Sequence, residues 1–367
     1  MGIATVGIVG CGTIGAGIAT SLAIHGFGVR LYDAQPAAAT RALAELTGFC
    51  ARAVEKGRLS PAAADAAVGR VRSCGDLAGL AAADLVIEAV FEDLAVKSAL
   101  FDALSGVLAR TTLVATNTSC LRIADLARHI TSPERFLGLH YFSPAATNPV
   151  VEVVQGEQTA AATVETAIAF CVAGGKRPLR CRDSHGFAIN RFFCPYSNEA
   201  VRLLDAGLGS PAQIDAAAQA AFGAAAGPFA VMNIIKPRIN LDAIRNLAPL
   251  GPFYAPAASL VAVGQSDGRW EMDRPAVPRA DTARLVDCLR AAVFLAVLEE
   301  LDEAVAAPGD IDMGARDALR FADPPCALMD RLGRSEVARL VTPLAARHGH
   351  RLPGSLGRVG RLTAGAA

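Results

Sequence analysis

The chain lacks a net charge and has no long hydrophobic run. Its 35 Lys and Arg residues balance 35 Asp and Glu residues, so we expect no long-range attraction to nucleic acid or to an anionic membrane. No uncharged apolar stretch approaches the roughly 20 residues that span a bilayer. The N-terminus lacks the basic segment of a signal peptide. We therefore expect a soluble, cytoplasmic protein without nucleic-acid or membrane partners.

Paired metal-binding and disulfide motifs are also missing. The nine cysteines include no C-x-x-C pair, and the six histidines do not cluster with them at zinc spacing. Several cysteines lie in apolar stretches, where a free thiol packs as a small hydrophobic side chain. The sequence thus predicts no metal site and a reducing compartment.

What the chain does have is a hydrophobic content of 52% over 367 residues, which is typical of a compact protein with more than one core. In the first half, short apolar runs alternate with longer helical patterns such as Asp93–Leu108, which predicts βαβ units and a parallel sheet. Eight strands are expected, at Thr5–Val9, Val29–Tyr32, Arg70–Ser73, Leu85–Glu88, Leu113–Thr116, Phe136–His140, Val150–Val154 and Arg177–Arg180.

The sequence changes character at about Ser184, where strand-like runs end and Ala-rich helical segments begin. We expect an α/β Rossmann domain at residues 1–184 and an all-α region after it. A weak repeat with an offset of 97 residues matches Ile214-Asp215 to Ile311-Asp312, and likewise Pro228 to Pro325 and Met232 to Met329. If this is not chance similarity, residues 185–283 and 284–350 form two tandem related helical units, with a flexible tail at 351–367.

A glycine-rich motif follows the first strand and opens the first helix: Gly10-Cys11-Gly12-Thr13-Ile14-Gly15. In such a G-x-G-x-x-G motif the first glycine permits a tight turn, the second lets a pyrophosphate approach the backbone, and the third allows close packing of helix and strand. The diphosphate then meets the amides at the helix N-terminus. The motif predicts a dinucleotide site; glycines that serve packing alone, or an FAD site, are the alternatives.

Asp33 ends the second strand and decides which dinucleotide is expected. Its carboxylate is suited to accept hydrogen bonds from both adenosine ribose hydroxyls and to repel a 2′-phosphate. The residues that follow it, Ala34-Gln35-Pro36, offer no arginine to offset that repulsion. The sequence therefore predicts NAD in preference to NADP.

A histidine and a glutamate occupy the ends of consecutive strands. His140 ends one strand, Glu152 lies early in the next, and a turn rich in Pro, Ala and Asn separates them. A carboxylate on one imidazole nitrogen fixes the tautomer and raises the basicity of the other nitrogen. Oxidation of an alcohol by NAD needs such a base to take the hydroxyl proton as the hydride leaves the carbon. A strand-capping histidine and an unrelated surface glutamate are the alternative.

Several motifs in order resemble the 3-hydroxyacyl-CoA dehydrogenase family, over roughly residues 3–235. The segments that carry the resemblance are GCGTIGAGIA, ADLVIEAVFEDLAVK, NTSCLRIADLA, ERFLGLHYFSP, VVEVV and DSHGFAINRFFCPYSNEA. The spacings from Ser119 to His140 and from His140 to Glu152 are those of the family. The helical repeat resembles the paired helical domains of bacterial multifunctional fatty-oxidation enzymes.

The resemblance implies a role for each matching residue. His140 would be the general base and Glu152 its partner, while Ser119 and Asn190 would bind the substrate oxygens. Glu92 and Lys97 would contact the nicotinamide ribose side of the cofactor, near Ser119 and Ser143. Alternatives are a helix N-cap for Ser119, a solvent-facing position for Asn190, and a surface ion pair for Glu92 and Lys97.

The chain departs from the family pattern at Ser143, His185, Thr147-Asn148-Pro149 and Lys236 to Arg238. Lys236 and Arg238 could meet a phosphopantetheine phosphate or a substrate carboxylate, or form a solvated loop. The expected reaction is the NAD-dependent interconversion of a 3-hydroxyacyl and a 3-oxoacyl thioester. Alternatives are a short polar hydroxyacyl group on an acyl-carrier protein, a free hydroxy acid, or an NAD-binding protein without catalysis. A monomer is favoured over a homodimer, because the second helical unit could cover the first.

Overall fold

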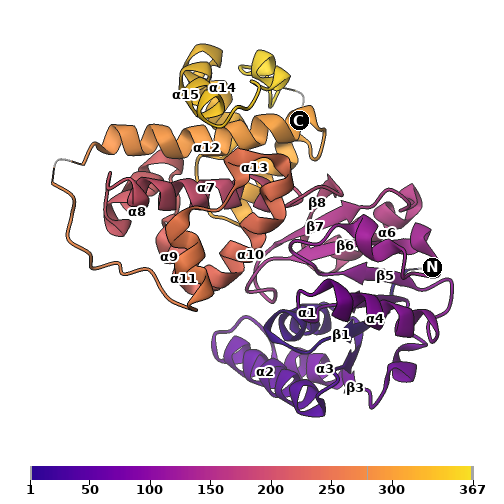
Figure 1. The fold of residues 1–367 in the computed structure, drawn as a ribbon. Helices are drawn as coiled ribbons and strands as arrows, with labels where there is room; N and C mark the ends of the chain where they lie inside the picture. Colours follow the sequence, from indigo (N-terminus) through magenta and orange to yellow (C-terminus); the bar gives the residue numbers. More distant parts are fainter. Residues whose placement is uncertain (1, 279, 365–367) are drawn as a thin grey trace. The chain divides into compact units, whose positions relative to one another are not determined.

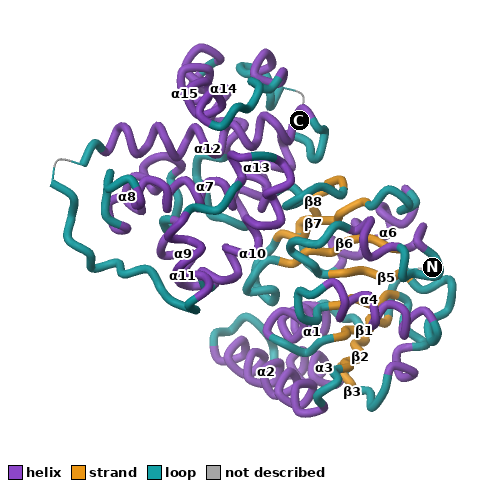
Figure 2. The backbone as a smooth tube through the Cα atoms, viewed as in Figure 1, coloured by secondary structure: helices purple, strands orange, loops and turns teal. Residues whose placement is uncertain are grey.

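A computed structural model describes residues 2–278 and 280–364 of the chain (Figures 1 and 2). The chain divides into two compact units between Asp183 and Ser184. The strands belong to the first unit, whereas the second is helical (Figure 2). Met1 and Arg279 of the predicted domains, and residues 365–367 of the predicted tail, lie outside the described residues.

An eight-stranded sheet forms the centre of the first unit, in the order β3-β2-β1-β4-β5-β6-β7-β8. Its strands are β1 (Thr5–Val9), β2 (Gly28–Tyr32), β3 (Val71–Ser73), β4 (Leu85–Glu88), β5 (Leu113–Thr116), β6 (Phe136–Tyr141), β7 (Val150–Gln155) and β8 (Arg177–Arg182). The pairs are parallel except for β6 with β7, which is antiparallel. The predicted α/β Rossmann fold and its eight strands are confirmed, with bounds that differ by at most two residues.

Six helices accompany the sheet: α1 (Thr13–Ile24), α2 (Pro36–Glu55), α3 (Pro61–Gly69), α4 (Leu94–Ser105), α5 (Ile123–Ala127) and α6 (Ala161–Ala173) (Figure 1). Side chains from α1, α2, α3 and α6 form one buried cluster with alternate residues of β1, β2 and β4 to β7. Leu137 and Leu139 of β6, for example, belong to this cluster. Because side chains alternate across a strand, Phe136 and His140 point to the other face.

That other face is covered by α4 and carries polar residues toward the carboxyl ends of the parallel strands. Phe101 of α4 meets Phe136 edge to face, with the ring centroids 5.3 Å apart. Helix α4 is shorter than the predicted Asp93–Leu108, because Asp93 is its N-cap and accepts a hydrogen bond from Val96 N. Its apolar residues also divide in two: Phe101 is in the core, whereas Val96 and Leu100 line a pocket.

The second unit contains nine helices within its described residues: α7 (Ile189–Asp205), α8 (Pro211–Phe222), α9 (Pro228–Ile235), α10 (Pro237–Leu247), α11 (Ala258–Gln265), α12 (Thr282–Asp302), α13 (Pro308–Asp317), α14 (Pro325–Leu332) and α15 (Arg334–Arg347). The offset of 97 residues takes the first residues of α8 and α9 to those of α13 and α14. It also relates their caps. Asp215 accepts hydrogen bonds from the amides of Phe229 and Ala230, and Asp312 from those of Cys326 and Ala327.

The two copies meet around a local two-fold relation. Ala224 forms an antiparallel bridge with Phe321, its own counterpart under the offset. Ala225 N donates to Arg320 O, and Ala322 N donates to Gly223 O, so each hydrogen bond is the image of the other. The helical unit is therefore built from two related copies of one arrangement that contact each other within a single chain.

The prediction of a flexible tail at 351–367 is wrong for the described residues 351–364. Leu356, Val359 and Leu362 are buried, and residues 354–358 form a short 3-10 helix. Asp330 accepts hydrogen bonds from the amides of Gly360, Leu362 and Thr363 and from the Thr363 hydroxyl. The segment has few large apolar residues, but one carboxylate that satisfies three amides compensates for that shortage.

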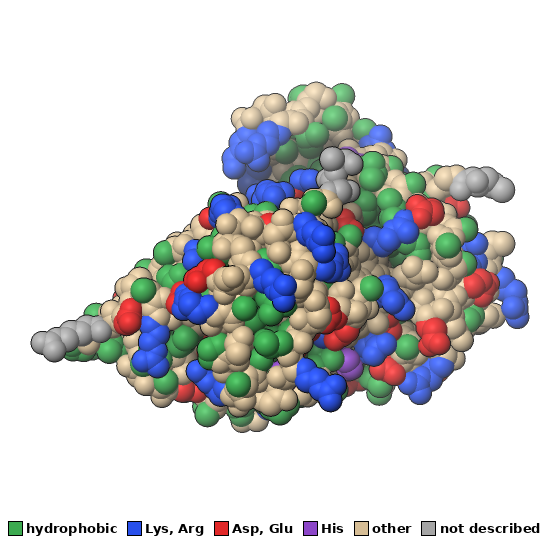
Figure 3. All heavy atoms as spheres, turned by 90° about the horizontal axis from the view of Figure 1, so that it is seen from above, with side chains coloured by type: hydrophobic (Ala, Val, Ile, Leu, Met, Phe, Trp, Pro, Cys, Tyr) green, Lys and Arg blue, Asp and Glu red, His purple; other side chains and the backbone are tan. Residues whose placement is uncertain are grey.

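The balanced charge of the sequence is visible on the surface of the protein. Basic and acidic side chains are interspersed over the face that Figure 3 shows. Within the described ranges, every helix is too short or too polar to cross a membrane.

Asp215 and Asp312 offer a matched test of the repeat. Each carboxylate accepts one buried and one partly buried amide, which alanine would leave without an acceptor, so Asp215→Ala and Asp312→Ala should each lower the free energy of unfolding by about 1–3 kcal/mol. Urea denaturation measures the loss, with the exposed Asp273→Ala as the control. A cap variant as stable as that control would contradict the structural role of its carboxylate.

Candidate active site and cofactor pocket

The turn between β1 and α1 requires its glycines for separate steric reasons. Gly10 has φ +96°, and a Cβ there would lie 2.5 Å from Ala89 O. A Cβ on Gly15 would lie 1.9 Å from Gly10 O. Around Gly12, by contrast, no described residue comes within 4 Å of such a Cβ. The Gly12 position is therefore open, and the amides that begin α1 are accessible to a diphosphate.

A pocket of ≈ 540 Å³ lies beside this turn. Its lining residues are Val9, Gly10, Gly12, Thr13, Ile14, Tyr32, Asp33, Ala34, Gln35, Ala38, Arg41, Leu77, Ala89, Val90, Phe91, Val96 and Leu100. Glycine-loop amides, a ribose-binding carboxylate and apolar walls in one pocket fit a dinucleotide such as NAD. Of the predicted cofactor residues, Gly10, Gly12, Thr13, Ile14 and Asp33 line the pocket.

Asp33 also organises the loop that surrounds it. Its Oδ2 accepts a hydrogen bond from Cys11 N at 2.7 Å and its Oδ1 one from Gln35 N at 2.8 Å. Cys11 itself is buried, and burial together with the Asp33 charge raises the pKa of its thiol to about 12. Cys11 therefore stays a neutral thiol in the loop, and its backbone amide, not its side chain, meets Asp33.

His140 and Glu152 lie directly opposite each other in the antiparallel pair of β6 and β7. The imidazole Nδ1 is 2.6 Å from Glu152 Oε2, and its Nε2 is 3.0 Å from Ser119 Oγ. Glu152 is fully buried and His140 is 5% exposed, so the carboxylate is shielded from water. If Nδ1 carries the proton that Glu152 accepts, Nε2 presents its lone pair on the Ser119 side.

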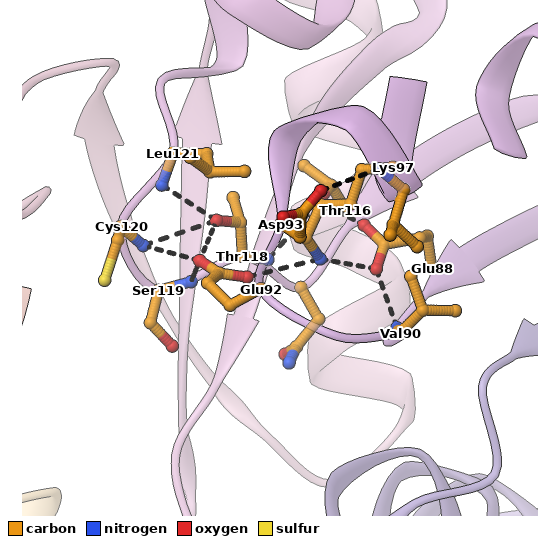
Figure 4. Close-up of polar contacts among 12 residues, drawn as sticks. Glu88, Val90, Glu92, Asp93, Lys97, Thr116, Thr118, Ser119, Cys120 and Leu121 are labelled. Atoms are coloured by element: carbon orange, nitrogen blue, oxygen red, sulfur yellow. Dashed lines mark hydrogen bonds and ion pairs between the residues drawn. The ribbon is translucent and has the colours of Figure 1, made fainter. Parts of the chain in front are cut away.

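Ser119 lies in a loop after β5 that a carboxylate from another loop holds in place (Figure 4). Glu92 Oε1 accepts hydrogen bonds from the amides of Ser119 at 2.9 Å and Cys120 at 3.0 Å. The Thr118 hydroxyl donates to the same oxygen. Ser119 is not the N-cap of α5, which is Arg122. The alternative of a capping role is therefore excluded, and the Ser119 hydroxyl is directed to His140.

The buried ammonium of Lys97 pairs with both Glu88 and Glu92 (Figure 4). Lys97 Nζ is 2.5 Å from Glu88 Oε1 and 3.3 Å from Glu92 Oε2, and the Lys97 side chain is 1% exposed. Glu88 is fully buried and also accepts from the Thr116 hydroxyl and from Val90 N. Neither Glu92 nor Lys97 lines the cofactor pocket, and Glu88, which sequence reasoning did not single out, completes their network. The simple surface ion pair considered for them is excluded.

The turn that joins β6 to β7 depends on Lys176, which no sequence motif singles out. Lys176 is buried and donates to Ala145 O at 2.7 Å and to Asn148 O at 2.8 Å. Burial lowers the pKa of Lys176 to about 8.

The predicted site residue Ser143 is exposed in the turn between β6 and β7. Asn190 belongs to the first turn of α7 in the helical unit.

A dinucleotide pocket and a carboxylate-braced imidazole define an NAD-dependent oxidoreductase. The NAD-binding domain of 3-hydroxyacyl-CoA dehydrogenase matches residues 5–184, and the C-terminal domain of that family matches residues 186–263. The chain belongs to the 3-hydroxyacyl-CoA dehydrogenase family, and its cofactor is NAD.

Relatives and solved structures agree with this assignment. The 3-hydroxyadipyl-CoA dehydrogenase of Escherichia coli (strain K12) is 41% identical over 238 residues, which are 65% of this chain but only 50% of that protein. Mitochondrial hydroxyacyl-coenzyme A dehydrogenase of Mus musculus is 34% identical over 69% of this chain and 83% of the relative. The crystal structure of an E. coli K12 3-hydroxybutyryl-CoA dehydrogenase superposes with a TM-score of 0.89, at 27% identity, over 100% of both chains.

The buried ion network predicts an asymmetric response to substitution. Lys97→Met leaves the Glu88 carboxylate buried without its cation, and such a loss costs about 3–5 kcal/mol of unfolding free energy. Urea denaturation should show this loss for Lys97→Met but not for the exposed control Lys56→Met. In the double variant Glu88→Gln/Lys97→Met, much of the loss should be recovered. If Lys97→Met were as stable as the wild type, the ion pair between Lys97 and Glu88 would not stabilise the fold.

Proposed function

We propose that this chain interconverts a 3-hydroxyacyl thioester and a 3-oxoacyl thioester, with His140 as the proton acceptor and donor. The observation that carries the proposal is the imidazole between two partners, with Nδ1 on buried Glu152 and Nε2 on the Ser119 hydroxyl. Among the described residues of the first unit, this histidine alone is bonded to a fully buried carboxylate.

In the oxidation direction, the hydroxyl on C3 of the substrate gives its proton to His140 Nε2. Bound NAD supplies the acceptor for the hydride that leaves C3, and a C3 carbonyl results. Glu152 stabilises the imidazolium that forms and keeps Nδ1 protonated. Glu92 holds the amides of the Ser119 loop, so the Ser119 hydroxyl keeps its direction toward the substrate oxygen. In the reduction direction, the same imidazolium returns the proton to the oxygen.

We assign Ser119 and Asn190 to the substrate oxygens and Glu92 to the ribose beside the nicotinamide, because the motif of the family matches at these positions. Glu92 is 34% exposed at its side chain, whereas Lys97 is buried behind it. Lys97 therefore acts on the cofactor through Glu92, by holding that carboxylate in place. Ser143 is assigned to the nicotinamide side of the pocket.

Two kinds of acyl group are candidates for the substrate. The E. coli relative that is 41% identical is named for 3-hydroxyadipyl-CoA, which ends in a carboxylate, and the superposed structures are named for 3-hydroxybutyryl-CoA. Lys236 and Arg238, at the junction of α9 and α10, are the chain's candidates for a substrate carboxylate or a phosphopantetheine phosphate. Acyl-CoA is the proposed carrier, with acyl-carrier protein as the alternative.

A substrate panel with purified protein tests the proposal. NADH formation is followed with 3-hydroxybutyryl-CoA, 3-hydroxyadipyl-CoA, a 3-hydroxyacyl group on an acyl-carrier protein, and free 3-hydroxybutyrate. We expect turnover with at least one CoA thioester and none with the free acid. Turnover of the free acid alone would reject the thioester assignment. NADH binding without turnover of any member of the panel would favour the non-catalytic alternative.

The proposed base predicts a separation between catalysis and binding. His140→Gln should reduce turnover by roughly 10²–10⁴-fold, because a general base is lost, while NADH still binds. The matched control is His129→Gln, a partly exposed histidine paired with Asp102 at the surface. Stopped-flow turnover and NADH fluorescence titration measure the two properties. Near-normal turnover in His140→Gln would remove this residue from the mechanism.

The helical repeat predicts the assembly state. The two copies in one chain contact each other across a local two-fold relation, and this internal contact can substitute for a two-fold interface between chains. We therefore expect a monomer. Sedimentation equilibrium at nanomolar and micromolar concentrations tests this, and a dimer that persists at nanomolar protein would contradict it. Truncation at about Ala280 should expose the shared face and cause aggregation or dimerisation.

A further inference from the structure

Two charged side chains line the cofactor pocket within the described part of the chain, Asp33 and Arg41. Asp33 directly follows β2, whereas Arg41 lies on α2 three residues after Ala38, which also lines the pocket. Residues three apart occupy the same face of a helix, so the α2 face that borders the adenosine end of the pocket carries a guanidinium. None of the three residues directly after Asp33 is an arginine.

The two side chains differ in how firmly they are held. Each oxygen of the Asp33 carboxylate accepts a backbone amide, from Cys11 or from Gln35. Arg41 is exposed, and it makes no hydrogen bond or ion pair with any residue in the ranges 2–278 and 280–364. The carboxylate is therefore fixed, while the guanidinium is free to reorient and to pair with a ligand.

A free guanidinium at this place matches one chemical group. NADP differs from NAD by a phosphate on the adenosine 2′-oxygen, and arginine binds phosphate through paired N–H donors. Asp33 accounts for rejection of that phosphate, because two anions would meet at the same ribose. Arg41 would attract the phosphate from the helix side. The wild-type selectivity is thus the difference between one repulsive and one attractive contribution.

We propose that Arg41 is a second determinant of cofactor choice, a latent ligand for a 2′-phosphate whose effect the Asp33 charge masks. When that charge is removed, the pocket accepts NADPH because Arg41 binds its 2′-phosphate, and not merely because repulsion has ended. The proposal concerns the NAD-binding unit and does not depend on the substrate assigned to the chain.

Direct binding of NADH and NADPH to the full chain, measured by nucleotide fluorescence, tests the proposal. The variants are Asp33→Asn, Arg41→Gln and the double variant, with the exposed Arg58→Gln as a control for lost surface charge. Asparagine is neutral and keeps one oxygen that can accept from the Cys11 amide, while the Gln35 amide loses its acceptor. NADH binding by Asp33→Asn verifies that the pocket is intact.

In the Asp33→Asn background, NADPH affinity should rise, and Arg41→Gln should then lower it by roughly tenfold or more, the size expected for a charge-assisted contact. NADH affinity should change by less than about threefold on adding Arg41→Gln, because NADH has no 2′-phosphate and loses no such contact. Arg58→Gln should leave both affinities unchanged. Equal NADPH affinity in Asp33→Asn and in the double variant would overturn the proposal.

A second measurement requires no change at Asp33. Adenosine 2′,5′-bisphosphate, used as a competitor of NADH, carries the 2′-phosphate on a minimal adenosine. Its residual affinity for the wild-type chain should fall by roughly tenfold in Arg41→Gln, whereas adenosine 5′-monophosphate should be little affected. Equal loss for the two competitors would assign Arg41 to general adenosine binding and reject the proposed specificity role.

Discussion

The antiparallel pairing of β6 with β7 is the constraint on which the rest of the site depends. In the parallel part of the sheet, the carboxyl ends of the strands share one edge, and β6 brings His140 to that edge. Because β7 runs the other way, its first residues lie at the same edge, and Glu152 faces His140 in the register. A shift by one residue would turn one of the two side chains to the α1 face of the sheet. The register therefore determines whether His140 and Glu152 meet.

The turn between these strands has to hold that register without secondary structure of its own. Lys176 supplies the restraint, since its buried ammonium binds two carbonyls of the turn from outside it. On the other side of the imidazole, Glu92 holds the Ser119 loop, and Lys97 and Glu88 hold Glu92. Buried charges are costly unless they are paired or hydrogen-bonded: Lys97 is paired with Glu88, and Lys176 donates to two carbonyls. The imidazole thus lies between two segments, each of which is held by a buried lysine.

Sequence reasoning succeeded where a local pattern determines the structure. The strands follow from short apolar runs, and the His140–Glu152 pair follows from strand ends on either side of a short turn. The cofactor loop follows from its glycines, since a Cβ added at Gly10 or Gly15 would collide with the backbone. It did not identify partners that lie outside the local pattern. For Lys97, a surface ion pair with Glu92 was the alternative to a cofactor contact, and the side chain is instead buried and paired with Glu88. The tail after His350 reads as disordered, yet Asp330 holds it through three amides.

Arg41 shows the same limit on a smaller scale. A window of three residues after Asp33 contains no arginine, but the helix that begins at Pro36 turns the residue eight positions after Asp33 back to the pocket. The face of a helix, and not the distance along the chain, decides which charge a ligand meets. The prediction of NAD as the cofactor is confirmed; in our proposal the fixed Asp33 carboxylate outweighs the exposed Arg41 guanidinium in the choice between NAD and NADP.

The helical repeat explains how two copies can keep one backbone while their sequences diverge. Gly223 and Arg320 are counterparts, and both adopt left-handed backbone angles, with φ of 59° and 61°. That conformation costs an L-residue such as arginine about 1–2 kcal/mol, whereas glycine tolerates it. Lys236, between α9 and α10, and its counterpart Gly333, between α14 and α15, also share a positive φ, of 78° and 82°. Here the glycine is in the second copy and the L-residue in the first. At each of these two positions, one copy has a glycine and the other has an L-residue with an unfavourable backbone angle.

What maintains these angles is the contact between the copies. The carbonyls of Gly223 and Arg320 accept the amides of Ala322 and Ala225, and these two hydrogen bonds can form only if both turns keep the same shape. The caps Asp215 and Asp312 add a second pair of matched restraints. A pseudo-symmetric interface therefore conserves backbone geometry more strictly than residue type, which is why the repeat is weak in the sequence and clear in the structure.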